Sequence, residues 1–200
     1  MFPEMVGLAN AVGLETDTES EGCSYLKRIG EAYEGHPLAL RVIAGEIKTT
    51  PFNGNVLAYW NKYGDEIKEV ENAIDQAKSS GLTASAADKY NLHKYTLKLR
   101  INVRSRLEKT FERLREVHHA YLLLCLASIY RCAVPESFWL SHLEDEGCDT
   151  EQQQQALEAL RSRDLVEQEI DPNHQCLLRQ HNLIRRVALE CLKKLDEEDE

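Results

Sequence analysis

Near the carboxyl end of the chain, a histidine and an amide residue precede a strongly apolar helical segment. The sequence reads Leu178-Arg179-Gln180-His181-Asn182-Leu183-Ile184-Arg185-Arg186-Val187-Ala188. The first turn of a helix leaves backbone N–H groups unpaired and carries partial positive charge, so a histidine there can bind a phosphate together with the backbone. The competing interpretation is structural. In that case His181 is a partly packed residue at the helix entry, and Asn182 is the N-cap, a position that asparagine favours.

A second segment with informative spacing lies near the other end of the chain. Gly35-His36-Pro37-Leu38-Ala39 separates two segments with helical periodicity. Gly35 can adopt the left-handed conformation that ends one helix, and Pro37 suits the first turn of the next, where a missing N–H costs nothing. Such Gly-x-Pro spacing is common at helix–turn–helix corners. By itself it therefore predicts only a corner.

Taken together and in this order, the two segments resemble parts of the NB-ARC ATPases. These are signal-transducing, AAA-related (STAND) ATPases that include plant disease-resistance and animal apoptosome proteins. The first segment is similar to their Gly-x-Pro-Leu-Ala element, and His181 matches the histidine of the Met-His-Asp motif that closes their winged-helix domain. Two positions of that motif depart from the family, because Gln180 replaces Met and Asn182 replaces Asp. The resemblance covers nearly the whole chain, but only the regulatory half of the family.

The resemblance implies a module that senses the state of a bound nucleotide. In the family, the proline that matches Pro37 packs against the adenine, so Gly35, Pro37, Leu38, His181 and Asn182 are the expected ADP-contacting residues. The partner implied is the nucleotide-binding domain of the same parent protein, with ADP or ATP as its cofactor. The module would close over ADP, swing away on exchange for ATP, and enter a homo-oligomer on activation. Because Asn182 lacks the charge of Asp, we expect a less tightly locked resting state.

The sequence lacks the parts that grip phosphates. No stretch reads Gly-x-x-x-x-Gly-Lys-Ser/Thr, and no apolar strand ends in paired acids that could hold magnesium. We therefore expect no catalytic residue, no ATP hydrolysis and no tight binding of ADP or ATP by this chain alone. The expectation is a part of a larger ATPase, or a polypeptide that has lost its catalytic part.

Composition restricts the class of partner. The chain has 200 residues, and its 34 acidic against 24 basic residues give a formal charge of −10. That charge disfavours nonspecific attraction to nucleic acid or to an anionic membrane. The longest apolar run, residues 120–130, is far shorter than the roughly 20 residues that span a bilayer. Six cysteines without a Cys-x-x-Cys pair predict reduced thiols in a cytoplasmic protein.

Most segments have helical rather than alternating periodicity, which predicts a mainly α fold. We expect a small helical bundle over residues 1–80, with helices at 3–14, 23–34, 37–48 and 56–77. Leu57 is expected in its core, and Gly64 as an interruption of its last helix. Residues 81–96 would form a connection, residues 97–195 a winged-helix domain with a short β-hairpin, and residues 196–200 an acidic tail.

Within the second domain, the segment 97–104 alternates as a strand would, but the resemblance favours a helix through 97–114. Further helices are expected at 118–130, 135–143 and 150–163, strands at 165–170 and 176–179, and a long final helix. Phe138 and Trp139 are both expected to face inward. The region 89–115 carries nine basic against two acidic residues, so it is either a polyanion-facing surface or a solvated helix face.

Three other kinds of chemistry have weaker support. A winged-helix module could instead bind nucleic acid or another protein, but the helix over 150–163 sets Glu151 and Glu158 against Arg161 and Arg163, a poor balance for phosphates. No metal site is expected, because the spacings of the histidines and cysteines between 118 and 148 fit no common zinc site. No Cys–His nucleophile is expected either, since no residue marks an activating environment for a cysteine.

Overall fold

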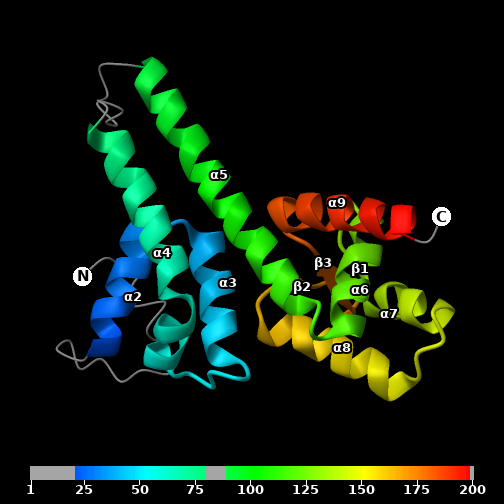
Figure 1. The fold of residues 1–200 in the computed structure, drawn as a ribbon. Helices are drawn as coiled ribbons and strands as arrows, with labels where there is room; N and C mark the ends of the chain where they lie inside the picture. The colour runs from blue at the N-terminus through cyan, green and yellow to red at the C-terminus, as the bar shows by residue number, and fades with distance from the viewer. Residues whose placement is uncertain (1–20, 80–88, 199–200) are drawn as a thin grey trace. The chain divides into compact units, whose positions relative to one another are not determined.

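The computed structural model describes residues 21–79 and 89–198. This part of the chain is mainly helical and contains a small three-stranded antiparallel sheet (Figure 1). The chain divides into two compact units, Met1–Arg106 and Leu107–Glu200, and each is described by itself. Within the described ranges, no helix combines the length and the apolar character that crossing a membrane requires.

The first unit is built from helices. It contains α2 (Glu21–Ala32), α3 (Pro37–Lys48), α4 (Val56–Ser79) and the first two thirds of α5 (Lys89–Leu114). Helix α2 packs against α4, and α3 is buried along almost its whole length. The core takes apolar residues at helical spacing from α2, α3 and α4, as an amphipathic pattern predicts: Leu26, Ile29, Leu38, Val42, Ile43, Ile47, Tyr59 and Ile67.

Gly64 does not interrupt α4, contrary to our prediction. Its role is close packing, because a Cβ atom at this position would lie 2.9 Å from Cε2 of Trp60. The Trp60 ring stacks on Tyr25 at a centroid distance of 4.5 Å, and the Arg28 guanidinium lies 4.5 Å from its centroid. Leu57 is 38% exposed, so its prediction as a core residue is also wrong. The buried stripe of α4 runs through Tyr59, and Leu57 lies off it.

The second unit combines helices with the sheet. After the end of α5 come α6 (His118–Leu126), the short 3-10 helix η1 (Ala127–Ile129), β1 (Val134–Pro135), α7 (Glu136–Asp145) and α8 (Thr150–Ser162). The hairpin strands β2 (Glu167–Ile170) and β3 (Cys176–Arg179) follow, and then α9 (Asn182–Glu198). The sheet order is β1-β3-β2, with Leu178 opposite both Val134 and Gln168. Helix α6 packs against α7, α8 and α9.

The core of the second unit follows the apolar stripes of these helices. Helix α8 begins with a capping box, in which Gln152 N–H donates to the Asp149 carboxylate at 2.8 Å and Asp149 N–H donates to the Gln152 side chain at 2.9 Å. In α7, Trp139 is fully buried but Phe138 is 51% exposed. The prediction that Phe138 faces inward is therefore wrong, because α7 buries Trp139 and Leu143, four residues apart, and the preceding residue points away.

The mainly helical class is confirmed, and several predicted elements match closely. Helix α3 has both predicted ends, and so does strand β3. The segment 97–104 is helical. Strand β1 was not predicted, since two residues that include a proline carry no periodicity. The predicted helix over 3–14, residues 81–88 of the predicted connection and the last two residues of the predicted tail lie outside the described ranges.

Two predicted boundaries need correction. Helix α5 begins at Lys89, so residues 89–96 are helical rather than part of a connection. The division between the compact units falls after Arg106, inside α5, because Arg106 bonds to residues of the first unit. At the other end, α9 continues to Glu198, so residues 196–198 of the predicted acidic tail are helical. Glutamate is a good helix former and nothing there stops the helix.

Candidate functional site

The corner between α2 and α3 carries the first group of predicted site residues. Helix α2 ends in a Schellman arrangement, with Glu34 N–H donating to Glu31 O at 3.1 Å and Gly35 N–H donating to Gly30 O at 2.9 Å. Both Glu34 and Gly35 have positive φ, 53° and 70°. The predicted left-handed glycine is thus confirmed, but it is the second of two such residues. A side chain at Gly35 would be strained.

The residues after the corner divide between surface and core. Pro37 begins α3 and is exposed, so one face of its ring is open to a ligand. Leu38 is only 4% exposed and packs in the core of the first unit. Gly35, Pro37 and Leu38 therefore lie together, but Leu38 can support Pro37 rather than offer a large contact surface of its own.

His181 and Asn182, the second group, lie at the start of α9 in the second unit. Leu183 N–H donates to Nδ1 of His181 at 3.2 Å, and Arg185 N–H donates to His181 O at 2.9 Å. These two bonds make His181 the N-cap of the helix. The interpretation of Asn182 as the N-cap is wrong, because Asn182 is already the first residue of α9 and its side chain is exposed. The imidazole of the preceding residue takes the capping role.

The capping bond also determines which ring nitrogen of His181 carries a proton. A neutral imidazole has one donor and one acceptor nitrogen. Because Nδ1 accepts from the backbone, the proton lies on Nε2. The adjacent residue holds this geometry in place: Gln180 is 8% exposed, and its Nε2 donates to Leu124 O of α6 at 2.7 Å. Gln180 therefore anchors the segment by a buried hydrogen bond.

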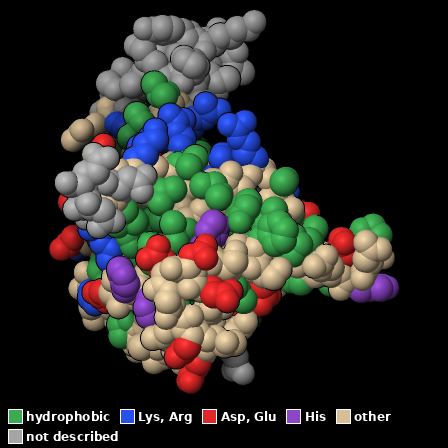
Figure 2. Space-filling model, turned by 90° about the vertical axis from the view of Figure 1, so that its right-hand side faces the viewer, with side chains coloured by type: hydrophobic (Ala, Val, Ile, Leu, Met, Phe, Trp, Pro, Cys, Tyr) green, Lys and Arg blue, Asp and Glu red, His purple; other side chains and the backbone are tan. Residues whose placement is uncertain are grey.

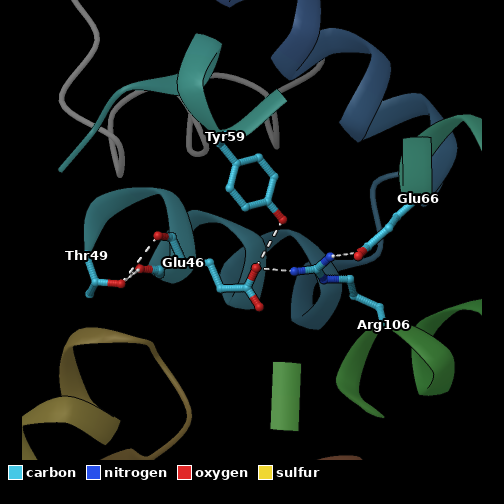
Figure 3. A network of polar contacts seen from close by, with 6 residues as sticks. Glu46, Thr49, Tyr59, Glu66 and Arg106 are labelled. Carbon is cyan, nitrogen blue, oxygen red and sulfur yellow. Dashed lines mark hydrogen bonds and ion pairs between the residues drawn. The ribbon is translucent and has the colours of Figure 1, made fainter. Parts of the chain in front are cut away.

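The first unit contains a buried ionic network that the sequence analysis did not predict. Arg106 of α5 donates to the carboxylates of Glu46 on α3 and Glu66 on α4, the latter at 3.1 Å. Tyr59 of α4 donates from its hydroxyl to Oε2 of Glu46 at 3.1 Å. Figure 3 shows these side chains converging from the three helices. The side chain of Arg106 is fully buried and that of Glu46 is 8% exposed.

The charge of Arg106 is maintained by this environment. Burial alone would lower the pKa of the guanidinium, but Tyr59, Glu46, Tyr33 and Glu66 raise the pKa well above its usual value. Arg106 therefore stays charged in the interior, where it links three helices. The network therefore positions the three helices relative to one another. A signal was present in the sequence: Val103, Arg106 and Thr110 share one face of α5, and all three are buried.

In the basic region 89–115, the side chains that the structure describes do not form one continuous polyanion-facing surface. Arg106 is buried, Lys98 donates to the backbone oxygen of Ala73, and Arg115 lies 5.2 Å from the ring centroid of Tyr121. Figure 2 does show lysine and arginine side chains gathered in one region of the face in view. The described part of the chain holds no group of three His, Cys, Asp or Glu side chains arranged to bind a metal ion.

The alternative function, binding of nucleic acid by a winged-helix module, depends on α8, which would enter a groove of the duplex. Its exposed residues include Glu151 and Glu158. Arg161 is half-buried and pairs with Glu136 at 2.5 Å, while Arg163 donates to the backbone oxygen of Ala159 at 3.0 Å. The outward face of α8 is thus acidic, which opposes phosphate contact.

No protein-family model matches the chain, and no curated protein matches it significantly.

Proposed function

We propose that this chain is the regulatory part of an NB-ARC-type signalling ATPase. In this proposal the first unit is the helical domain and the second is a winged-helix domain. Together they close over ADP that is held by a nucleotide-binding domain of the same parent protein. Exchange for ATP releases them, and the released form assembles into an oligomer.

The order of elements in the second unit supports the winged-helix assignment. A helix, a short strand, two helices and a β-hairpin follow one another from α6 to β3, and the sheet order is β1-β3-β2. In this arrangement α8 is the third helix of the domain, and the turn between β2 and β3 is the wing. The segment from Gln180 to Asn182 follows the last strand directly, and the motif that it resembles closes the winged-helix domain of the family.

The single observation that carries the proposal is the capping geometry of His181. Its Nδ1 accepts the Leu183 N–H, so the ring is held at the helix start with the Nε2 proton as its donor. The N-terminus of a helix attracts anions through its partial positive charge. A phosphate oxygen at this point would accept a hydrogen bond from Nε2–H and gain from the helix dipole.

Pro37 supplies supporting chemistry in the first unit. A proline at the first position of a helix is rigid, and Pro37 is exposed there. A flat, apolar adenine ring can pack on such a surface without displacing any hydrogen bond. The proposal thus assigns base contact to Pro37 and phosphate contact to His181.

The test uses the longer protein that the proposal requires, in which a nucleotide-binding domain precedes this chain. His181→Ala removes both the donor and the cap, whereas His181→Ser keeps an efficient cap but lacks the imidazole. A lost charge-assisted hydrogen bond costs about 1.5–3 kcal/mol, so both variants should release ADP roughly ten- to a hundredfold faster. Only the alanine variant should also lose about 1 kcal/mol of stability.

Displacement of fluorescent ADP and thermal unfolding measure the two effects separately. His174→Ala, in the turn between β2 and β3, is the control and should leave ADP release unchanged. Normal ADP affinity in His181→Ser would show that His181 is only a capping residue. The isolated chain should bind ADP weakly or not at all, and calorimetry that detects micromolar binding with Mg²⁺ would contradict the proposal.

A further inference from the structure

Helix α5 presents two aliphatic side chains to solvent in the first unit. Leu97 is 51% exposed and Ile101 is 57% exposed. Residues four apart lie on one side of a helix, so these two side chains are neighbours. The buried residues Val103 and Arg106 lie on the opposite side of α5. The exposed pair is therefore outside the core of the unit and forms an apolar contact surface.

Basic side chains flank this pair. Arg100 is exposed, and no other described residue pairs with it, while the half-buried Arg104 follows one turn later. From Lys89 to Leu107 the helix has six basic residues and no acidic one. We call the four residues of this surface the basic face of α5: Leu97, Arg100, Ile101 and Arg104.

The charge of the basic face restricts what can cover it. A second copy of the same helix would bring the arginines of both copies together, and like charges facing each other oppose association. An amphipathic helix with acidic residues beside its apolar stripe is complementary instead, because it covers the aliphatic side chains and neutralises the arginines.

A segment of this kind precedes α2 in the same chain. Residues 1–20, which lie outside the described ranges, contain four acidic residues and no lysine or arginine. Their apolar residues include a set with the spacing of one helix face: Met5, Leu8, Ala9 and Val12. Glu4 stands before this stripe and Glu15 follows it. The segment therefore combines the apolar spacing and the negative charge that would complement the basic face.

We propose that residues 3–14 pack as an amphipathic helix on the basic face of α5, with their apolar stripe on Leu97 and Ile101. The flanking acidic residues then lie beside Arg100. Burial of the aliphatic side chains drives the contact, and opposite charges determine its position. The contact belongs to the first unit and is independent of nucleotide binding.

Hydrogen exchange of the intact chain, followed by mass spectrometry, tests the apolar part of the contact. A docked helix protects its amides, so residues 3–14 should exchange more slowly than a free peptide of the same sequence. Leu97→Gln combined with Ile101→Gln should speed this exchange roughly tenfold, because the apolar burial is lost. The matched control is Phe138→Gln in the second unit, at a residue that is also 51% exposed, and it should have no effect on residues 3–14.

A charge reversal tests the polar part. Arg100→Glu should also speed the exchange of residues 3–14, because it places a negative charge beside an acidic segment. Adding Glu4→Lys and Glu15→Lys to this variant should restore the protection, which a general loss of folding would not allow. Arg131→Glu, at an exposed arginine of the second unit, is the control and should leave the exchange unchanged.

Three outcomes would overturn the proposal. In the first, residues 3–14 of the unaltered chain exchange as fast as the free peptide, so nothing is docked. In the second, their protection persists after the substitutions at Leu97 and Ile101, which would place the segment on another surface. In the third, the protection increases with protein concentration, which would mean that a second copy supplies the segment.

Discussion

The interiors of the two units are built on different principles. Among the described residues, the buried charged side chains, Glu46 and Arg106, belong to the first unit, whereas the buried polar residues of the second unit are the neutral Thr110, Ser128 and Gln180. A buried charge is costly unless its partner is present, and an intact buried pair adds little net stability. The first unit thus gains a defined arrangement of α3, α4 and α5 rather than a large increase in stability. The second unit depends on apolar packing around Trp139 and Leu157.

This difference predicts different responses to mutation. In the first unit, loss of one member of the network leaves another charge buried without compensation, so the response should be abrupt. In the second unit, removal of part of an apolar side chain leaves a cavity whose cost depends on how well the neighbours relax. The comparison can be tested by substitutions that alter either the buried ionic network or the apolar packing, one at a time.

The largest effect is expected from Arg106→Met, which keeps an unbranched apolar stem but removes the charge. The buried Glu46 would keep its hydrogen bond from Tyr59 but lose its charged partner, at a cost of about 3–5 kcal/mol. Urea unfolding should measure this loss, and hydrogen exchange should show that it is confined to α3, α4 and the neighbouring part of α5.

A matched pair of variants sharpens this prediction. Leu157→Ala, at a fully buried position of α8, should cost about 2–5 kcal/mol with faster exchange in the second unit. Adding Glu46→Met to Arg106→Met should recover much of the loss, because the pair is then replaced by apolar groups. A loss below about 1 kcal/mol for Arg106→Met would show that Glu46 is not held as a buried charge.

A smaller change in stability is expected from Gly64→Ala, and whether this change stabilises or destabilises the protein is informative. In an exposed helix this change would stabilise the protein by about 1 kcal/mol. In α4, however, the new Cβ would lie 2.9 Å from the Trp60 ring, which is held by its stack on Tyr25. Overpacking typically costs about 1–3 kcal/mol, so the net effect should be destabilising. A higher thermal midpoint for Gly64→Ala would show that Trp60 can move away.

The smallest effect concerns pH and the second unit. Burial, partly opposed by Asp145, lowers the pKa of His142, and Nε2 of this ring has no hydrogen-bond partner among the described residues. The unfolded chain therefore binds a proton at this site more readily than the folded unit does. Histidine in the unfolded chain has a pKa of about 6.5. As the pH falls below this value, the stability that the neutral ring contributes should decrease, and the decrease should end once the pH is below the lower pKa of His142 in the folded unit.

His142→Gln should remove this part of the pH dependence. Thermal midpoints of both proteins, compared between about pH 8 and pH 5, measure it, because the other titrating groups cancel in the difference. Equal slopes for the two proteins would mean that His142 titrates alike in the folded and unfolded states.

Local elements could be predicted because their signals lie within a few residues. Pro37 begins α3 where a proline should begin a helix, and the apolar spacing that follows extends to Lys48. Strand β3 follows a turn-rich segment and has both predicted ends. Local signals were less decisive where either of two adjacent residues could fill the same position, as at the N-cap of α9. Asn182 is the better capping residue by preference, yet the His181 ring makes the bond, since the preceding Gln180 is anchored to α6.

The sequence by itself determined the mainly helical class, most helix boundaries and the hairpin, since periodicity and turn residues act locally. Only the tertiary structure decided which polar groups meet. Arg106 belongs to a strongly basic region, and its charge predicts solvent exposure, but Glu46, 60 residues away, brings it into the core. Partners of this kind depend on distances between remote segments, and those distances exist only after the chain has folded.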